Sequence, residues 1–201
     1  MHAILSLVRG QRTADIFQPQ KHIMKSQDIF ILLKLVSLNQ RDNRDSSRQS
    51  VRMLAELTGV GKTEVSKSLN RSISVSLAKK NRTTGLISVN RKALFEFIYY
   101  GLQYVFPAQM QALTRGVPTA FAAPVLKKKL FSPGQTIPVW PSSDAQQMGQ
   151  AIQPLYKTVP KAIANDNTLY AALALVDAIR IGNAREKNSA ASELRLLLAL
   201  D

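Results

Sequence analysis

Residues 51–77 restrict the fold of this chain most strongly, because two amphipathic stretches there are joined by only three residues. The first stretch places apolar side chains at roughly helical spacing: Val51, Leu54, Ala55 and Leu57. Gly59-Val60-Gly61 follows it, and glycine tolerates the left-handed backbone that ends a helix. A turn of this length sets the next helix at a steep angle. We expect Val60 to fill the corner between the two helices.

The second stretch, from Lys62 to about residue 77, has two different faces. Val65, Leu69 and Ile73 are spaced four residues apart and are predicted to face inward. The opposite face is predicted to be exposed, with short hydrogen-bonding and cationic side chains: Thr63, Ser66, Lys67, Asn70 and Arg71, after Lys62 at the helix start. Such side chains meet base edges and phosphates, and arginine binds guanine through two parallel hydrogen bonds. The alternative is an ordinary solvated helix surface.

The letters Gly61-Lys62-Thr63 also resemble the end of an NTPase phosphate-binding loop, but the spacing excludes that interpretation. The loop requires a glycine five residues before Gly61, where this chain has Glu56. It also follows a buried strand, whereas the residues before Gly59 are predicted to be helical.

The charge of the chain points to a polyanionic partner. The formal net charge is +14 and the pI is about 10.3, so we expect nucleic acid or, less favoured, an anionic membrane surface. Residues 44–92 contain 11 basic and 3 acidic residues, so the partner is predicted to bind the N-terminal half. With 45% hydrophobic residues among 201, the chain can still bury a real core.

The composition excludes several kinds of chemistry. The chain has no cysteine, and its two histidines are His2 and His22, so thiol catalysis, a cysteine or histidine metal site and a Ser-His-Asp triad are not expected. No paired carboxylates or nucleophile–base pair are apparent, so neither an enzyme nor a cofactor is predicted. The apolar residues 3–8 are too few to span a membrane and precede Arg9 and Arg12. We therefore expect a soluble cytoplasmic protein.

The segments before the two-helix motif are predicted to be an arm over residues 1–21 and a largely buried helix over about 22–40. A polar break, residues 39–50, contains Arg41, Arg44 and Arg48, which either hold phosphates or belong to a solvated loop. Ser47 or Ser50 is expected to cap the following helix with its hydroxyl group.

The segment after the motif begins with a basic tip that contains Lys79, Lys80, Asn81 and Arg82, and a short strand over residues 85–89 is predicted to follow. The tip is either a contact to the DNA backbone or minor groove, or an ordinary charged loop. Asn90 is expected to cap a helix over residues 91–105. Its Tyr99, Tyr100 and Tyr104 favour core packing or a dimer contact, with stacking on bases still open.

The remainder of the chain changes character. Residues 107–160 hold eight of the nine prolines, which predicts extended segments, and Trp140 indicates that they pack against something. Asp166 or Asn167 is expected to start a helix, Gly182 to bend it, and residues 184–200 to form a last helix. The predicted fold class is mainly α: a winged helix-turn-helix domain plus a proline-rich segment and C-terminal helices.

Helix, polar break, two-helix motif, basic tip and aromatic helix together resemble the winged helix-turn-helix domains of bacterial transcription regulators, MarR-like or antitoxin-like. The resemblance rests on this order and on LAELTGVGKTEVSKSLNR, and covers about residues 22–105. It implies a DNA-binding domain over 22–106 and a C-terminal domain over 107–201. It places Lys62 at a phosphate and assigns the groove and wing residues: Thr63, Ser66, Lys67, Asn70 and Arg71 at the groove, Lys79, Lys80 and Arg82 in the wing. The wing departs from the family because a second strand is not obvious.

The second half is similar to a group of uncharacterised bacterial proteins that share phrases such as GLQYVFPAQ and ALVDAIRIGNARE, a likeness that carries no chemistry. Arg115 and Arg185 are candidates for binding a carboxylate or phosphate effector, because arginine forks match those groups. Asp177, Arg180 and Glu186 are expected to form ion pairs that fix the bend at Gly182.

These patterns predict a homodimeric regulator that binds double-stranded DNA and acts as a repressor at an inverted repeat. The alternative is an adaptor or antitoxin that holds a protein partner through residues 107–201 and binds DNA for autoregulation. A third interpretation is sequence-independent binding of RNA or single strands through the tyrosines.

Overall fold

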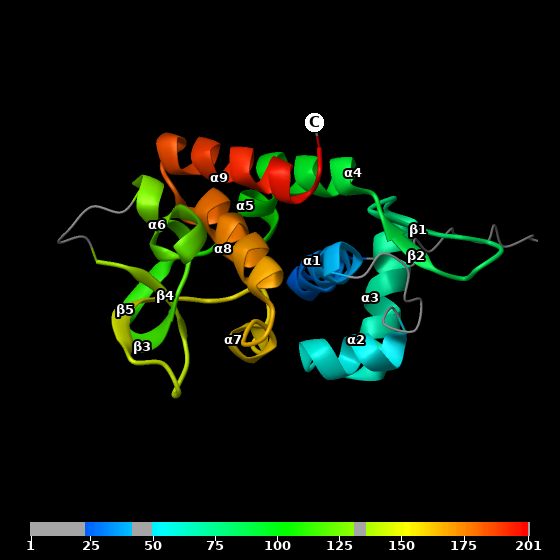
Figure 1. Ribbon diagram of the computed structural model, residues 1–201, viewed down its shortest axis with the longest axis horizontal. Coiled ribbons are helices and arrows are strands. Elements are labelled where there is room, and N and C mark those ends of the chain that lie inside the picture. The colour runs from blue at the N-terminus through cyan, green and yellow to red at the C-terminus, as the bar shows by residue number, and fades with distance from the viewer. Residues whose placement is uncertain (1–22, 42–49, 131–135, 201) are drawn as a thin grey trace, which may run out of the picture.

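The two-helix motif lies at one end of the molecule and the proline-rich segment at the other (Figure 1). The computed structural model describes residues 23–41, 50–130 and 136–200. The predicted arm over residues 1–21, both histidines, Ser47 and Arg48 lie outside these ranges. Helix α1 (Ser26–Arg41) runs between the two ends and contacts both helices of the two-helix motif and the helix over residues 167–181.

Helix α1 confirms the helix that the sequence predicts over residues 22–40. Its side chains from Ile29 to Val36 are almost completely buried, as expected for a helix that is apolar over a wide arc. The buried polar side chains of α1 have partners in both halves of the chain: Asp28 binds Arg71, whereas Lys34 and Ser37 bind Asp166. Residues from both halves therefore pack into one hydrophobic cluster around α1.

Helices α2 (Val51–Thr58) and α3 (Lys62–Ser74) form the predicted pair. The Ser50 hydroxyl accepts a hydrogen bond from the Met53 amide at 3.2 Å, which caps α2. Gly59 adopts the left-handed conformation, with φ of 67°, and Val60 is only 1% exposed. The predicted helix-ending glycine and the predicted buried valine of this turn are thus confirmed.

A short hairpin follows α3. Strand β1 (Ala78–Lys80) pairs antiparallel with β2 (Ile87–Val89), and Ala78 lies opposite Val89. The sequence shows no obvious second strand of good length, and the structure agrees on length because β1 and β2 have three residues each. A short second strand nevertheless exists. Lys79 and Lys80, which are predicted at the tip, lie in β1 because they pair with β2.

One continuous helix follows the hairpin, as predicted over residues 91–105. It consists of α4 (Arg91–Glu96), the π-helical turn η2 (Phe97–Gly101) and α5 (Leu102–Val105). The Asn90 side chain accepts a hydrogen bond from the Ala93 amide and caps the first turn.

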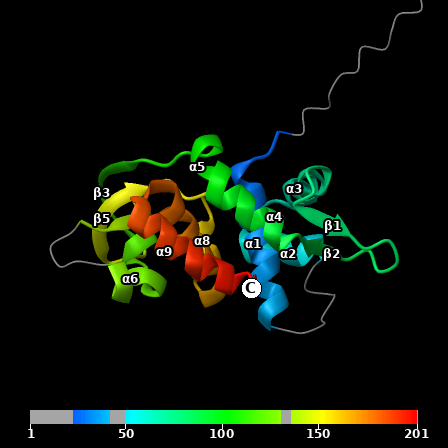
Figure 2. The same cartoon turned by 90° about the horizontal axis from the view of Figure 1, so that it is seen from above.

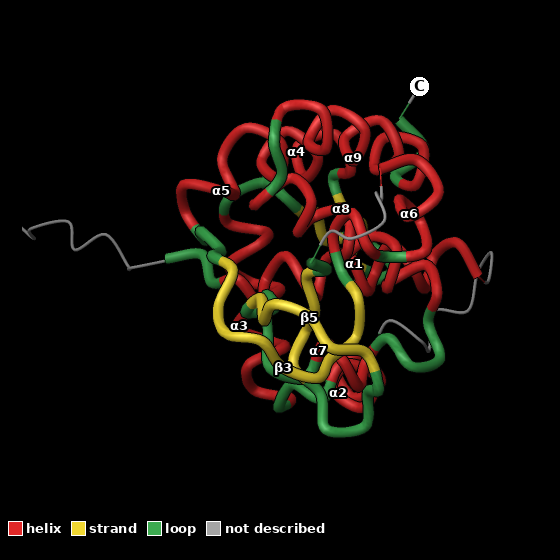
Figure 3. Tube along the Cα trace, turned by 90° about the vertical axis from the view of Figure 1, so that its left-hand side faces the viewer, coloured by secondary structure: helices red, strands yellow, loops and turns green. Residues whose placement is uncertain are grey.

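The mainly α prediction needs correction in the proline-rich segment, so the described fold is mixed α and β. Strands β3 (Met110–Pro118), β4 (Pro138–Pro141) and β5 (Gln147–Ile152) close into a small barrel in which β3 is antiparallel to both others. Figure 3 shows this sheet facing the viewer, with α8 behind it. The turn η3 (Ala120–Ala122) and helix α6 (Pro124–Leu130) connect β3 to β4.

The barrel closes tightly because glycines stand where its strands meet. A Cβ atom at Gly116 would lie 2.2 Å from the Trp140 carbonyl oxygen, and one at Gly149 would lie 2.3 Å from the Ile137 carbonyl oxygen. Trp140 itself is only 1% exposed, in agreement with the expectation that it packs against other residues.

Three helices complete the chain: α7 (Val159–Ala162), α8 (Asn167–Ile181) and α9 (Ala184–Leu197). The Asp166 carboxylate caps α8, and the chain bends at Gly182, both as predicted. Helix α8 packs against α1 and α9. Figure 2 shows α9 beside α4 and α5, where the Tyr99 hydroxyl donates to the Asn188 amide oxygen at 3.1 Å.

Candidate nucleic-acid interface

An exposed polar face runs along α3. Its members are the predicted residues other than Arg71: Lys62, Thr63, Ser66, Lys67 and Asn70. The opposite side is held inward by Val65 and Leu69, which are 0% and 3% exposed. Ile73, at the last turn, is half-buried. The two-faced character that the sequence predicts is therefore present over most of the helix.

Arg71 corrects that prediction, because its side chain is buried and not available to a groove. Its guanidinium donates two hydrogen bonds to Asp28 of α1, from Nε at 2.8 Å and from a terminal nitrogen at 2.6 Å. Only 10% of the Arg71 side chain and none of the Asp28 side chain is exposed. The hydrogen bonds that Arg71 donates to Asp28 are the main reason that the pKa of Arg71 is raised, and this pair joins α3 to α1.

Glu64 fastens the start of α3 to α1. Its carboxylate accepts a hydrogen bond from the Gln27 side chain at 3.0 Å and lies 3.5 Å from the Lys25 ammonium. The hydrogen bond from Gln27 lowers the pKa of Glu64, with a smaller contribution from the nearby lysines. A carboxylate in the first turn also faces the positive end of the helix dipole. Lys67, at 3.8 Å, shares this carboxylate and remains 62% exposed.

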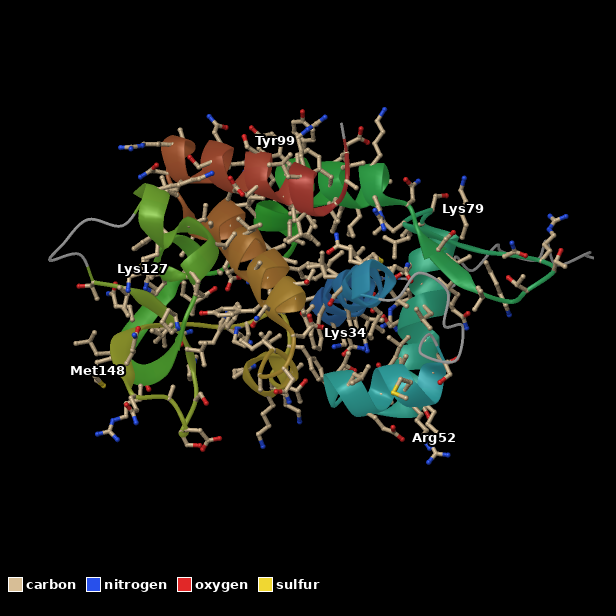
Figure 4. All side chains as sticks on the ribbon, viewed as in Figure 1. Lys34, Arg52, Lys79, Tyr99, Lys127 and Met148 are labelled. Carbon is tan, nitrogen blue, oxygen red and sulfur yellow. The ribbon has the colours of Figure 1, made fainter. Side chains whose placement is uncertain are left out.

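The hairpin carries the second group of predicted residues. Lys79, Lys80 and Arg82 are all exposed, on β1 and on the loop that follows it. The Asn81 side chain shapes this loop because its oxygen accepts hydrogen bonds from the amides of Thr83 and Thr84. Figure 4 shows Lys79 on the hairpin where it passes α3.

Helix α3 and the hairpin form one positively charged surface. Strand β1 packs against α3, and the Leu77 amide donates to the Ser72 carbonyl oxygen at 2.9 Å. The acidic residues between positions 50 and 90 are Glu56 and Glu64, and each has a basic partner. Exposed basic residues outnumber them: Arg52, Lys62, Lys67, Lys79, Lys80 and Arg82. Such a surface attracts a polyanion at long range.

The tyrosines of the aromatic helix divide into two groups. Tyr99 packs against the hydrophobic cluster and stacks on Phe95, with ring centroids 5.9 Å apart. Tyr100 and Tyr104 are 68% and 76% exposed. The expectation of core packing is therefore confirmed for Tyr99 only, and a dimer contact through the other two stays a prediction.

The polar residues predicted near Gly182 only partly form the expected network. Arg180 does bind Asp177, at 2.7 Å, and it also donates to the Phe106 carbonyl oxygen at 3.0 Å. Glu186 instead accepts from the Asn183 amide in the capping box of α9. The bend is thus fixed by local capping, whereas Arg180 ties α8 to the end of the aromatic helix.

The two predicted effector ligands are not brought together in a site. Arg115 is exposed on β3, and Arg185 is exposed in the first turn of α9. Neither lines the cavities that the structure forms around Asp166, around Tyr170 or around Arg195.

Of the pairs in two buried polar clusters, the sequence predicts only that between Asp177 and Arg180. The Asp177 carboxylate accepts hydrogen bonds from Trp140 Nε1 at 2.6 Å and Thr119 Oγ1 at 3.0 Å, besides Arg180. Burial raises the pKa of Asp177, against the opposing effect of these donors. In the second cluster Lys34 lies 2.7 Å from Asp166. Two sequence features indicated these clusters: Lys34 within an apolar helix, and the single tryptophan Trp140. Each needs a polar partner when it is buried.

Within residues 23–41, 50–130 and 136–200, no group of histidine and acidic side chains is arranged to hold a metal ion. None of the helices described there is both long and apolar enough to cross a membrane. No family model, curated protein or solved structure matches the chain. The surface formed by α3 and the β1–β2 hairpin is therefore the feature from which we infer a function.

Proposed function

We propose that residues 22–106 form a winged helix-turn-helix domain and that this protein is a cytoplasmic regulator that binds double-stranded DNA. One observation carries the proposal: α3 presents an exposed row of Thr63, Ser66, Lys67 and Asn70 while its other side is anchored to α1. In a winged helix such a helix enters the major groove, and the hairpin follows the adjoining backbone.

The chemistry of the exposed side chains suits a division of roles. The amide of Asn70 can pair with adenine through two hydrogen bonds, and the hydroxyls of Thr63 and Ser66 can meet bases or phosphates. Lys62, Lys67, Lys79, Lys80 and Arg82 supply positive charge for phosphates. Sequence preference is therefore expected to reside in α3, and salt dependence mainly in the lysines and the hairpin.

We further propose that two copies act together as a repressor. Two recognition helices related by a twofold axis would meet major grooves about one helical turn apart, so the operator is expected to be an inverted repeat. The exposed rings of Tyr100 and Tyr104 offer apolar surface for the second copy. Light scattering of the purified protein tests the dimer, and a reporter under the selected operator tests the sign of regulation.

The test of DNA binding starts from selection of bound duplexes out of a random library, followed by fluorescence anisotropy at several salt concentrations. Asn70→Ala should cost about 1–3 kcal/mol on the selected duplex and flatten the preference at one base position. Lys79→Ala should weaken binding to all duplexes similarly and reduce the salt slope by about 1.

Lys127→Ala is the matched control. It removes the same charge from α6, at the opposite end of the molecule from Lys79 (Figure 4). This variant should bind like the unmodified protein. Selection that enriches no duplex, or equal losses for Lys79→Ala and Lys127→Ala, would contradict the proposed interface.

A second candidate function is an adaptor or antitoxin with a protein partner on residues 107–201. The supporting observation is apolar surface on the barrel, where Leu113 and Met148 are 65% and 56% exposed. Leu113 and Arg115 are two residues apart on β3, and Met148 lies opposite Arg115 on β5, so these side chains share one sheet face.

Co-purification from the native organism tests this candidate. A stoichiometric partner should be recovered with the unmodified chain and lost with the Leu113→Ser, Met148→Ser double variant. The Lys127→Ala variant again serves as a control because it leaves the barrel face intact. Equal recovery with all three proteins would place the partner elsewhere.

A further inference from the structure

A cleft of about 500 Å³ opens between α1, α2 and the segment from α7 to the start of α8. Its apolar wall includes Leu38 of α1 and Met53 and Leu57 of α2. Its polar wall includes Lys34, Lys161 and Asp166. Clefts of this size, with an apolar lining and a few polar groups, are typical small-molecule sites.

Lys34 is the unusual feature of this cleft. Its side chain is only 4% exposed, yet it contributes to the cleft wall, and Figure 4 shows it between α1 and α2. An ammonium group carries three N–H donors, and one of them binds Asp166 at 2.7 Å. A buried ammonium gains from further acceptors, because unmet donors away from water are costly.

Asp166 already has several donors. Its Oδ1 accepts from the Ser37 hydroxyl and the Leu169 amide, and its Oδ2 accepts from Lys34 and the same hydroxyl. Burial acts to raise the pKa of Asp166, but the hydrogen bonds from Lys34, Ser37 and Leu169 together lower it. Asp166 is therefore ionised at neutral pH and offsets one positive charge in the wall.

The rim of the cleft adds one basic and one acidic group. Lys161 is exposed on α7. Glu56 of α2 accepts a hydrogen bond from Arg52 at 3.1 Å, so its charge is partly offset. The charged side chains that line the cleft balance one another, Lys34 and Lys161 against Glu56 and Asp166. Because Arg52, outside the lining, pairs with Glu56, and Asp166 pairs with Lys34, Lys161 is the charge that attracts an anionic ligand.

We propose that this cleft binds a small organic carboxylate with an apolar body. The carboxylate would lie between Lys161 and Lys34, where two ammonium groups can donate to its oxygens. The apolar body would cover Leu38, Met53 and Leu57 and remove them from water. A neutral molecule of the same shape would lose the charge attraction of both lysines, and a cationic one would be repelled by them.

A ligand in this cleft would change how α2 and α3 are oriented and thereby change DNA affinity. This effect on DNA affinity rests on the proposed DNA binding. The cleft is bordered by α2, and the end of α2 is already tied to the loop before α7, because the Thr158 hydroxyl donates to the Thr58 carbonyl oxygen at 2.5 Å. A molecule that bridges α2 and α7 would shift the orientation of α2, and with it that of α3.

Binding is tested without DNA, with hexanoate, hexan-1-ol and hexylammonium as probes of equal chain length. Hexanoate should shift the amide NMR signals of Leu38, Leu57 and Ala162 and saturate with a Kd of about 1 mM, as expected for so small a ligand. Hexan-1-ol should bind more weakly and hexylammonium weakest. Tighter binding of hexylammonium, or shifts confined to other parts of the chain, would overturn the proposal.

Two variants and one control locate the site. Lys161→Ala should weaken hexanoate binding about threefold to fivefold, and Ala162→Trp should weaken it at least tenfold by filling the cleft. Lys157→Ala, outside the cleft, should leave the Kd for hexanoate unchanged, and equal effects of both lysine variants would refute the site.

The coupling to DNA is tested next. Hexanoate should change the Kd of the protein for the selected duplex. Saturable binding without such a change would refute the coupling alone, whereas absence of DNA binding by the ligand-free protein would refute the proposed function.

Discussion

Replacing Arg71 with alanine should lower the free energy of unfolding. It should not act by removing a contact to a DNA base. The side chain lies on the helix that is proposed to enter the groove, but it points to α1 and forms two short hydrogen bonds with Asp28. Alanine at this position would leave the Asp28 carboxylate, which is 0% exposed, with only the Lys25 amide as a partner among the described residues.

The cost follows from burying an unpaired charge. Breaking a buried ion pair by removing one partner costs about 3–5 kcal/mol. For a chain of this size, about 1 kcal/mol corresponds to about 2–4 °C in Tm, so Arg71→Ala should lower Tm by about 6–20 °C. A double variant, Asp28→Leu with Arg71→Met, removes both charges and should recover most of the loss, because apolar replacements of buried pairs are often close to neutral.

Urea denaturation followed by circular dichroism measures these free energies, with Lys67→Ala as the matched control. Lys67 is 62% exposed on the same helix, so its removal should leave the unfolding free energy within about 0.5 kcal/mol. Its DNA affinity should nevertheless fall. If Arg71→Ala kept the stability of the unmodified protein and lost DNA binding, Arg71 would act at the groove and its buried structural role would be refuted.

Three further predictions concern the C-terminal half. Trp140→Phe removes the indole donor to the buried Asp177 carboxylate and should lower the unfolding free energy by about 1–3 kcal/mol, measured by urea titration. Gly149→Ala should destabilise by about 3 kcal/mol in the same assay, because its Cβ would lie 2.3 Å from the carbonyl oxygen of Ile137, the residue before β4. Burial raises the pKa of Tyr170 from 10.0 to about 12, so the folded state holds this proton longer and stability should fall as pH rises from about 10 to 12. The Tyr170→Phe variant should lack that component of the loss, and identical pH profiles would contradict the assignment.

Much of the N-terminal half follows from local sequence signals. The spacing of Val65 and Leu69, the left-handed glycine after α2 and the caps at Ser50, Asn90 and Asp166 all depend on residues within one or two helical turns. These features are visible in the sequence because the interactions that cause them are close along the chain.

The barrel was not predictable in the same way. Prolines indicate extended backbone, but they do not specify which segments pair, and β3 reaches β4 and β5 across an intervening helix. The tight contacts of Gly116 and Gly149 exist only after the strands have met. Strand pairing over such separations is decided by the whole tertiary arrangement.

The sequence by itself determined that residues 62–74 form a helix with one apolar and one polar side, because helical periodicity is a local property. Only the tertiary structure decided which polar side chains stay exposed. Arg71 stands at the flank of the polar side and is long enough to turn either way, and it turns inward because Asp28, 43 residues earlier in the chain, is buried beside it. Among the described residues, Lys67 and Asn70 meet no such buried acid and remain exposed to solvent.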